Sequence, residues 1–258
     1  MPRENPKAVM RISEHLRELR KRLLLSIGGI AVASVAGWFL YEPVMEIITY
    51  PITSSGTSGL QLNFQTIGAA FDMKMRVSIW VGILLSSPWW IGQLAAFIAP
   101  ALKRREKIFV LAFGLAGLVL FASGAFLGML IAPRAVTILN SFTPEGAASL
   151  LRADAYITFY TRLVILFGLS FLLPVALVAA NFAGLIRAIS MLKAWRWVVV
   201  SCFIFTAIAN PLPSPWPMTV QAIILISLYL IAVGISALNE WWKRKHAAKD
   251  KSGIIKAE

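Results

Sequence analysis

Long uncharged apolar runs, separated by short polar and basic segments, fill most of the chain. A run of about 20 residues is long enough to cross the bilayer core as a helix, so the pattern predicts membrane spans. Together they make 1–240 a single six-span membrane domain, followed by a basic tail at 241–258. The expected class is an all-α polytopic membrane protein with six transmembrane helices. We place the spans at about 23–41, 77–99, 108–132, 163–182, 197–212 and 217–238.

Several features of these spans predict irregular packing. The fifth and sixth spans are expected to be short; the fifth has about 13 apolar residues before a proline-rich turn, roughly 20 Å of helix against a bilayer core of about 30 Å. Such a span requires tilting, burial or local thinning of the bilayer. Pro88 predicts a kink in the second span. Glycines at 114, 117, 124 and 128 predict close helix packing in the third. Loops are expected at about 42–59 and 133–161.

The basic residues are distributed unevenly around the spans. Lys and Arg number seven in 1–22, four in 103–107, three in 183–196 and six in 243–258, which all lie on one side if the spans alternate. The other side has five. Because basic loops stay in the cytoplasm, we expect both termini to be cytoplasmic, in the plasma membrane.

Composition excludes several classes of function. The chain is 58% apolar and only 14% charged, with a mean hydropathy of +0.73, which disfavours a soluble enzyme. Its +13 charge lies in clusters that flank spans rather than on a basic face for nucleic acid. The usual hydrolase, zinc-protease and nucleotide-binding motifs are absent, so we expect no enzyme, no metal and no cofactor. Almost no ionisable residue lies within the spans, which counts against an ion-coupled transporter, although a small-solute transporter remains an alternative.

Two carboxylates, Glu18 and Glu106, lie within otherwise basic cytoplasmic clusters. One interpretation of such a glutamate is a local i,i+4 partner, for example of Glu18 with Arg22. The alternative is that both carboxylates face a common cytoplasmic pocket and bind a cationic ligand. Guanidinium groups suit such a pocket because they make paired, planar hydrogen bonds to carboxylates.

Three segments carry a family resemblance. Residues 15–23, HLRELRKRL, are similar to the H-L-x-E-L-R-x-R-L opening of the twin-arginine translocase subunit TatC. Residues 87–102, SPWWIGQLAAFIAPAL, followed by Glu106, resemble the family's S-x-P-x-x-x-x-Q-x-W-x-F-I-x-P-A-L-x-x-x-E. Residues 181–186, NFAGLI, are similar to its turn before span five. The resemblance extends from about residue 10 to 240.

The resemblance implies a six-span, glove-shaped receptor for the export of folded proteins, driven by the proton-motive force. It would bind twin-arginine signal peptides, assemble with TatA- and TatB-type single-span partners, and form a homo- or hetero-oligomer. By motif position, Glu18 and Glu106 would be the signal-binding carboxylates. Arg20, Gln93 and Phe97 would belong to the same signal-peptide site. Pro51 would be a functional residue of the first loop.

The chain also departs from the family pattern inside the membrane. Leu172 replaces a glutamate of an F-E-x-P pattern in span four, and Leu230 replaces another in span six. The turn after span five, around Ser214, lacks the family's Asp and Gln. Either the chain uses different TatA-type partners, or it is a divergent paralogue with narrower cargo. A divergent assembly subunit without signal binding is a further alternative.

Overall fold

The computed structural model describes residues 12–54, 61–63, 68–98, 107–141, 150–182, 184–209 and 215–255. Within them the fold is helical, apart from two strands of three residues each, which confirms the predicted all-α class. In chain order the elements are α1 (Ile12–Phe39), α2 (Tyr41–Ser54), β1 (Gln61–Asn63), α3 (Ala69–Leu85), α4 (Ser87–Ile98), α5 (Lys107–Asn140), β2 (Leu150–Arg152), α6 (Ala153–Phe182), α7 (Ala188–Lys193), α8 (Trp195–Ala209) and α9 (Pro215–Ile255).

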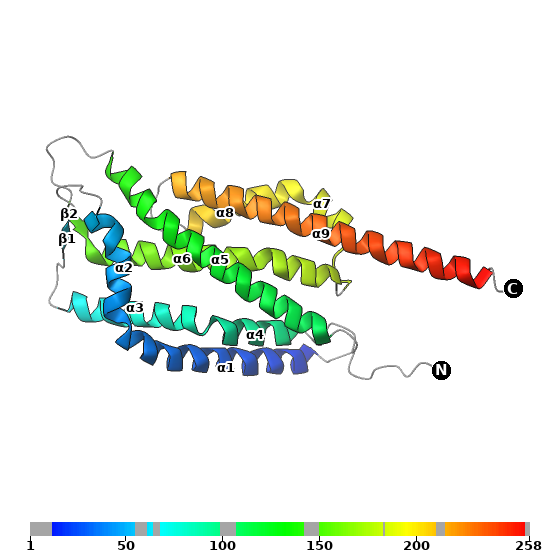
Figure 1. Ribbon diagram of the computed structural model, residues 1–258, viewed down its shortest axis with the longest axis horizontal. Coiled ribbons are helices and arrows are strands. Elements are labelled where there is room, and N and C mark those ends of the chain that lie inside the picture. Colours follow the sequence, from blue (N-terminus) through cyan, green and yellow to red (C-terminus); the bar gives the residue numbers. More distant parts are fainter. Residues whose placement is uncertain are drawn as a thin grey trace.

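The long helices form an elongated bundle (Figure 1). Helix α5 packs along α6, α1 packs on α3 and α4, and α9 packs on α6 and α8. Helix α1 begins and α9 ends at the same end of the bundle, which we call the termini end. Strands β1 and β2 pair in parallel at the opposite end, which we call the strand end.

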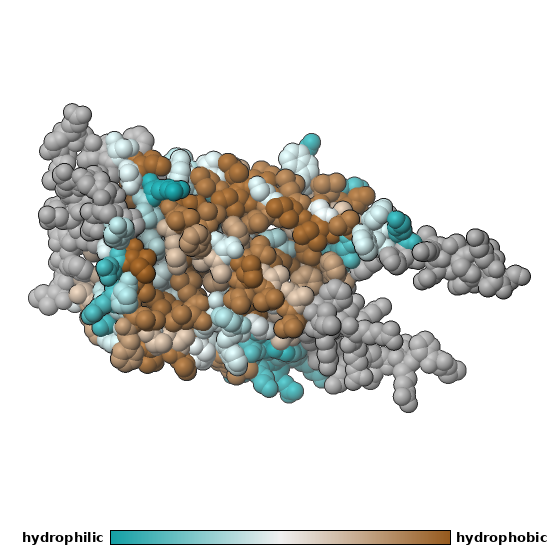
Figure 2. All heavy atoms as spheres, viewed as in Figure 1, coloured by the Kyte–Doolittle hydropathy of each residue, from teal (hydrophilic) through white to brown (hydrophobic). Residues whose placement is uncertain are grey.

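Apolar helices cover the described parts of the predicted spans. Helices α3 and α4 form a bent pair with an angle of 55°, and α8 is a shorter apolar helix. A broad apolar surface covers the middle of the molecule between more hydrophilic ends, as expected for a bilayer-embedded bundle (Figure 2). The sixth span is not short, because its apolar part covers 28 residues. Within the described residues, four single helices are long and apolar enough to cross a membrane: Leu16–Phe39, Leu111–Ile138, Ala153–Phe182 and Pro215–Trp242.

Two prolines bear on the predictions: the kink expected at Pro88 is present, and the loop expected around Pro43 is a helix. The kink expected at Pro88 is the break between α3 and α4, where proline occupies the second residue of α4 and costs no helical hydrogen bond. The loop expected at 42–59 is helical as far as Ser54. Pro43 lies in the first turn of α2, where a missing N–H is tolerated.

The second expected loop, 133–161, is also partly wrong. Helix α5 continues to Asn140, and α6 already begins at Ala153. Pro133 lies inside α5 without ending it, because a membrane protein can satisfy the freed backbone groups through neighbouring structure. Helix α5 therefore ends, and α6 begins, toward the strand end, where α6 packs on β2.

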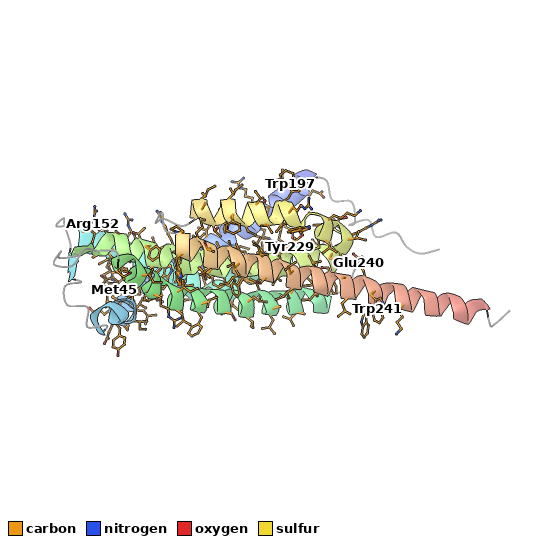
Figure 3. All side chains as sticks on the ribbon, turned by 90° about the horizontal axis from the view of Figure 1, so that it is seen from above. Met45, Arg152, Trp197, Tyr229, Glu240 and Trp241 are labelled. Atoms are coloured by element: carbon orange, nitrogen blue, oxygen red, sulfur yellow. The ribbon has the colours of Figure 1, made fainter. Side chains whose placement is uncertain are left out.

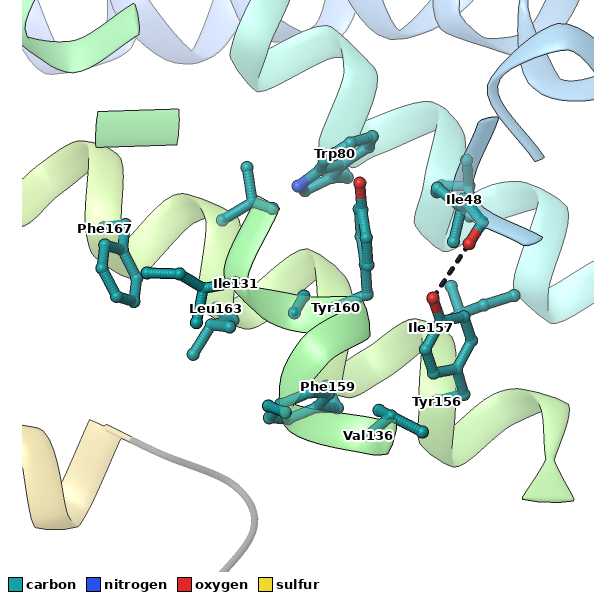
Figure 4. Close-up of a cluster of buried hydrophobic side chains, with 14 of the residues drawn as sticks. Ile48, Trp80, Ile131, Val136, Tyr156, Ile157, Phe159, Tyr160, Leu163 and Phe167 are labelled. Atoms are coloured by element: carbon teal, nitrogen blue, oxygen red, sulfur yellow. Dashed lines mark hydrogen bonds between the residues drawn. The ribbon is translucent and has the colours of Figure 1, made fainter. Parts of the chain in front are cut away.

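The main core lies around α6 (Figure 4). Trp80 of α3 packs edge-on against Tyr160, and Leu163 and Phe167 are fully buried. The hydroxyl of Tyr156 donates to the backbone oxygen of Ile48 at 2.9 Å. This buried bond fixes α2 against the start of α6 at the strand end.

Candidate functional site

At the termini end, α1 and α4 bring Glu18, Arg22 and Gln93 together. Arg22 donates from Nε at 3.0 Å and from Nη2 at 2.7 Å to the same oxygen, Oε1 of Glu18. Its Nη1 donates to Oε1 of Gln93 at 3.4 Å. The local interpretation of Glu18 as a partner of Arg22 is therefore confirmed, and the pair also joins two helices.

The Glu18 carboxylate has one oxygen that Arg22 leaves unused. The Glu18 side chain is only 22% exposed, and that of Arg22 is 25% exposed. Oxygen Oε2 of Glu18 is buried and has no hydrogen-bond partner among the described residues. A buried, unsatisfied oxygen costs about 1–3 kcal/mol, and more when charged, which a cationic donor would recover.

A second hydrogen bond joins α4 to α1 and helps to hold the two helices together at this site. The indole Nε1 of Trp89 donates to the backbone oxygen of Leu25 at 3.0 Å. Trp89, Gln93 and Phe97 follow one another at i,i+4 spacing, so they share one face of α4. Phe97 is half-buried and lies one turn beyond Gln93. The site thus combines a preorganised carboxylate with a neighbouring aromatic side chain.

The other predicted site residues are placed differently. Arg20 is exposed and lies roughly 200° around α1 from Glu18, so it does not join the Glu18–Arg22–Gln93 cluster. Pro51 belongs to α2, which packs at the strand end, far from this cluster. Glu106 lies outside the described residues. Its approach to Glu18 remains a prediction.

An apolar cavity of about 240 Å³ lies between α4, α5 and α6. Ile91, Leu94 and Ala95 line it from α4, about 100–200° around that helix from Gln93 and so on the side away from the face that Trp89, Gln93 and Phe97 share. Leu172 also lines this cavity. Because leucine stands here in place of the glutamate of the family pattern, the cavity is apolar. Leu230 is 53% exposed on α9, and Ser214 lies outside the described residues.

A polar network near the end of α6 was not predicted from the sequence. Oε1 of Glu240 accepts from Asn181 Nδ2 at 2.9 Å and from the backbone N–H of Ala188 at 2.7 Å. Asn239 donates to Asn181 Oδ1 at 3.1 Å. The carboxylate therefore caps α7 and holds the turn between α6 and α7 (Figure 3). In the sequence, the available signal for this network was Glu240, a single acidic residue at the end of the last span.

A second polar contact, also missed, lies deep in the bundle. Gln221 of α9 is 1% exposed, and its Nε2 donates to the Ser170 hydroxyl of α6 at 3.4 Å. In the part of the chain that the structure describes, no cluster of three or more His, Cys, Asp or Glu could hold a metal ion.

The fold and this site define a polytopic helical membrane protein whose termini end presents a half-buried carboxylate arranged to accept guanidinium donors. The family is defined by sequence comparison. The model for Sec-independent protein translocase protein (TatC) matches residues 14–223. The chain belongs to the TatC family, and the resemblance in its motifs is confirmed. Proteins of this family are components of a protein translocase rather than enzymes.

Relatives match over most of the chain. The TatC protein of Xylanimonas cellulosilytica is 38% identical, across 90% of this chain and 85% of its own length. That of Rothia mucilaginosa is 33% identical, across 98% and 88%. A crystal structure described as the twin arginine translocase receptor TatC is 31% identical and covers 86% of this chain and 99% of its own, with a TM-score of 0.78.

Proposed function

We propose that this chain is the receptor subunit that binds twin-arginine signal peptides for Sec-independent export of folded proteins. The relatives carry the name of that translocase, and the similar crystal structure is described as its receptor. One observation of this chain carries the proposal: Glu18 keeps a buried carboxylate oxygen without a described partner, beside Arg22 and Gln93.

Arg22 indicates how a signal arginine would bind. It places two guanidinium donors on one oxygen of Glu18 and a third toward Gln93. A signal arginine would use the other oxygen of Glu18 or displace Arg22 from the first. Lysine is a poorer substitute, because its ammonium lacks the planar fork that matches a carboxylate. In this proposal Glu106 supplies the second carboxylate, one for each arginine of the pair.

The apolar stretch of a signal peptide needs a different surface. Phe97 follows Gln93 along α4 on the face that meets α1, whereas the apolar cavity lies on the other side of that helix. We propose that the apolar stretch packs against Phe97 on the face of α4 that carries Gln93. Burial of apolar side chains would then add to the charge-assisted bonds at Glu18.

The proposal includes an orientation and partners. The excess of basic residues at the termini end favours a cytoplasmic location of both termini, in the plasma membrane. TatA- and TatB-type single-span proteins are the proposed partners, and the proton-motive force the energy source. Because Leu172 makes the cavity between α4 and α6 apolar, Leu172→Glu should change which single-span partner co-purifies. Unchanged co-purification would contradict a partner contact at this cavity.

The test removes the charge of Glu18 without changing its shape. Glu18→Gln should lower the affinity for a twin-arginine signal peptide by about tenfold or more, because a hydrogen bond to a charged group contributes about 1.5–3 kcal/mol. Glu106→Ala should abolish export of a twin-arginine reporter while the protein stays in the membrane. Glu42→Gln, an exposed acid on α2, is the matched control and should change neither. Normal binding and export by the Glu18 and Glu106 variants would contradict the proposal.

A further inference from the structure

A second cleft, of about 470 Å³, lies between α3 and α6 toward the strand end. Both helices begin at that end, so they run in the same direction along the cleft. Asp72, Arg76, Ile79 and Ile83 line it from one face of α3, because their spacing of three and four residues repeats with the helix. None of the residues proposed to bind the signal peptide lines it.

The charges of the cleft do not balance. Arg76 Nε bonds to Asp72 Oδ2 at 2.8 Å, and Arg152 Nη2 bonds to Asp154 Oδ2 at 2.9 Å. The hydrogen bond and charge of Asp154 raise the pKa of Arg152 above its usual value. Both acids are thus paired, and none of the ion pairs among the described residues includes Arg162, which also lines the cleft. The cleft therefore carries one surplus guanidinium.

The surplus charge belongs to Arg162, whose position along α6 can be compared with that of Arg76 along α3. Arg76 and Arg162 lie roughly 10–14 Å along their helices from the first residues of α3 and α6, at 1.5 Å per residue. Arg152 and Asp154 are closer to the strand end, opposite Glu240 at the termini end (Figure 3). All three arginines therefore line the part of the cleft nearer the strand end.

Beyond the arginines the cleft is apolar. Ile79 and Ile83 follow on α3, and Ile165 follows on α6, all closer to the middle of the bundle. Ile79 is 47% exposed, so this part of the cleft opens to the apolar surface. A ligand that matched the whole cleft would need an anionic group at one end and an alkyl chain at the other.

We propose that this cleft binds one phospholipid of the leaflet at the strand end, with its phosphate on Arg162 and an acyl chain along the isoleucines. The charge complementarity favours an anionic headgroup such as that of phosphatidylglycerol. The phosphate would accept paired guanidinium bonds, and the acyl chain would bury Ile79 and Ile83. This inference is independent of signal-peptide binding.

The experiment titrates delipidated, full-length protein in detergent and counts bound lipid by native mass spectrometry. Phosphatidylglycerol is compared with diacylglycerol, which lacks the phosphate, and with glycerol phosphate, which lacks the chains. We expect phosphatidylglycerol to bind about tenfold more tightly than either, because only this lipid satisfies both parts of the cleft. Equal binding of glycerol phosphate would indicate a free-anion site and overturn the proposal. Equal binding of diacylglycerol would also overturn it.

A pair of matched variants locates the site. Arg162→Gln should reduce phosphatidylglycerol affinity by about tenfold, the effect of losing a charge-assisted hydrogen bond. Arg134→Gln removes an equal charge from an exposed position on α5 outside the cleft and should leave the affinity unchanged. Equal losses in both variants, or no loss in Arg162→Gln, would overturn the proposal. If Arg162→Gln does not fold, the comparison of the three probes on the unmodified protein still decides.

Discussion

Three glycines of α5 permit a controlled test of helix packing. Each is replaced by alanine, so each variant adds one Cβ atom to the same helix. At Gly124 that atom would lie 2.6 Å from the backbone oxygen of Phe167, which is 0.8 Å short of ordinary contact at 3.4 Å. At Gly128 it would lie 2.8 Å from Cα of Val164. At Gly114 it would meet Ala95 at an ordinary 3.5 Å.

The expected magnitude follows from these contacts. Replacing glycine by alanine in a helix gains about 1 kcal/mol of propensity at all three positions, so that gain cancels in the comparison. At Gly124 and Gly128 the obstacle is the backbone of α6, and overpacking of this kind costs about 1–3 kcal/mol. Both variants should therefore be less stable than Gly114→Ala by about 1–3 kcal/mol in free energy of unfolding.

The assay is thermal unfolding of the purified variants in one detergent, followed by circular dichroism. A difference of that size corresponds to a Tm lower by about 2–10 °C than that of Gly114→Ala. Gly114→Ala itself should match or exceed the unmodified protein. Equal Tm values for all three variants would refute the close approach of α5 and α6.

Two further predictions concern the polar contacts that the sequence analysis missed. Glu240→Ala should speed hydrogen exchange of the amide of Ala188, because the N–H loses its acceptor, at a cost of about 1–3 kcal/mol. Glu240→Gln keeps a carbonyl acceptor and should protect that amide; equal exchange in both variants would contradict the capping role. Gln221→Leu should change the free energy of unfolding by less than about 1 kcal/mol, since hydrogen bonds within membrane bundles average about 0.6 kcal/mol. A loss above about 2 kcal/mol would show that its bond to Ser170 contributes more than this average.

Periodic and compositional signals predicted the helices well. Uninterrupted apolar runs of span length have few alternatives in a bilayer. Among the described residues, four single helices and one bent pair are long and apolar enough to cross it, and the fifth run forms the shorter helix α8. Helix ends were less predictable. The loops expected at 42–59 and 133–161 both begin in a helix, where Pro43 lies in the first turn of α2 and Pro133 lies inside α5.

In the candidate site, the helices that carry the residues were predictable from the sequence, but the contacts between those helices were not. The motifs placed Glu18, Gln93 and Phe97 on α1 and α4, and the contact through Arg22 joins the two helices. Pairing between helices could not be read from either segment alone, because it depends on how α4 packs against α1. The same holds for Asn181 and Glu240, which are 59 residues apart in the chain.

In the proposed function, α1 and α4 form the receptor for the arginine pair of a signal peptide. A photo-crosslinking amino acid at Phe97, offered a twin-arginine signal peptide or its Lys-Lys variant, tests this receptor site directly. We expect crosslinking to the Arg-Arg peptide that is lost with Lys-Lys and reduced by Glu18→Gln. Equal crosslinking of both peptides, or of neither, would contradict it.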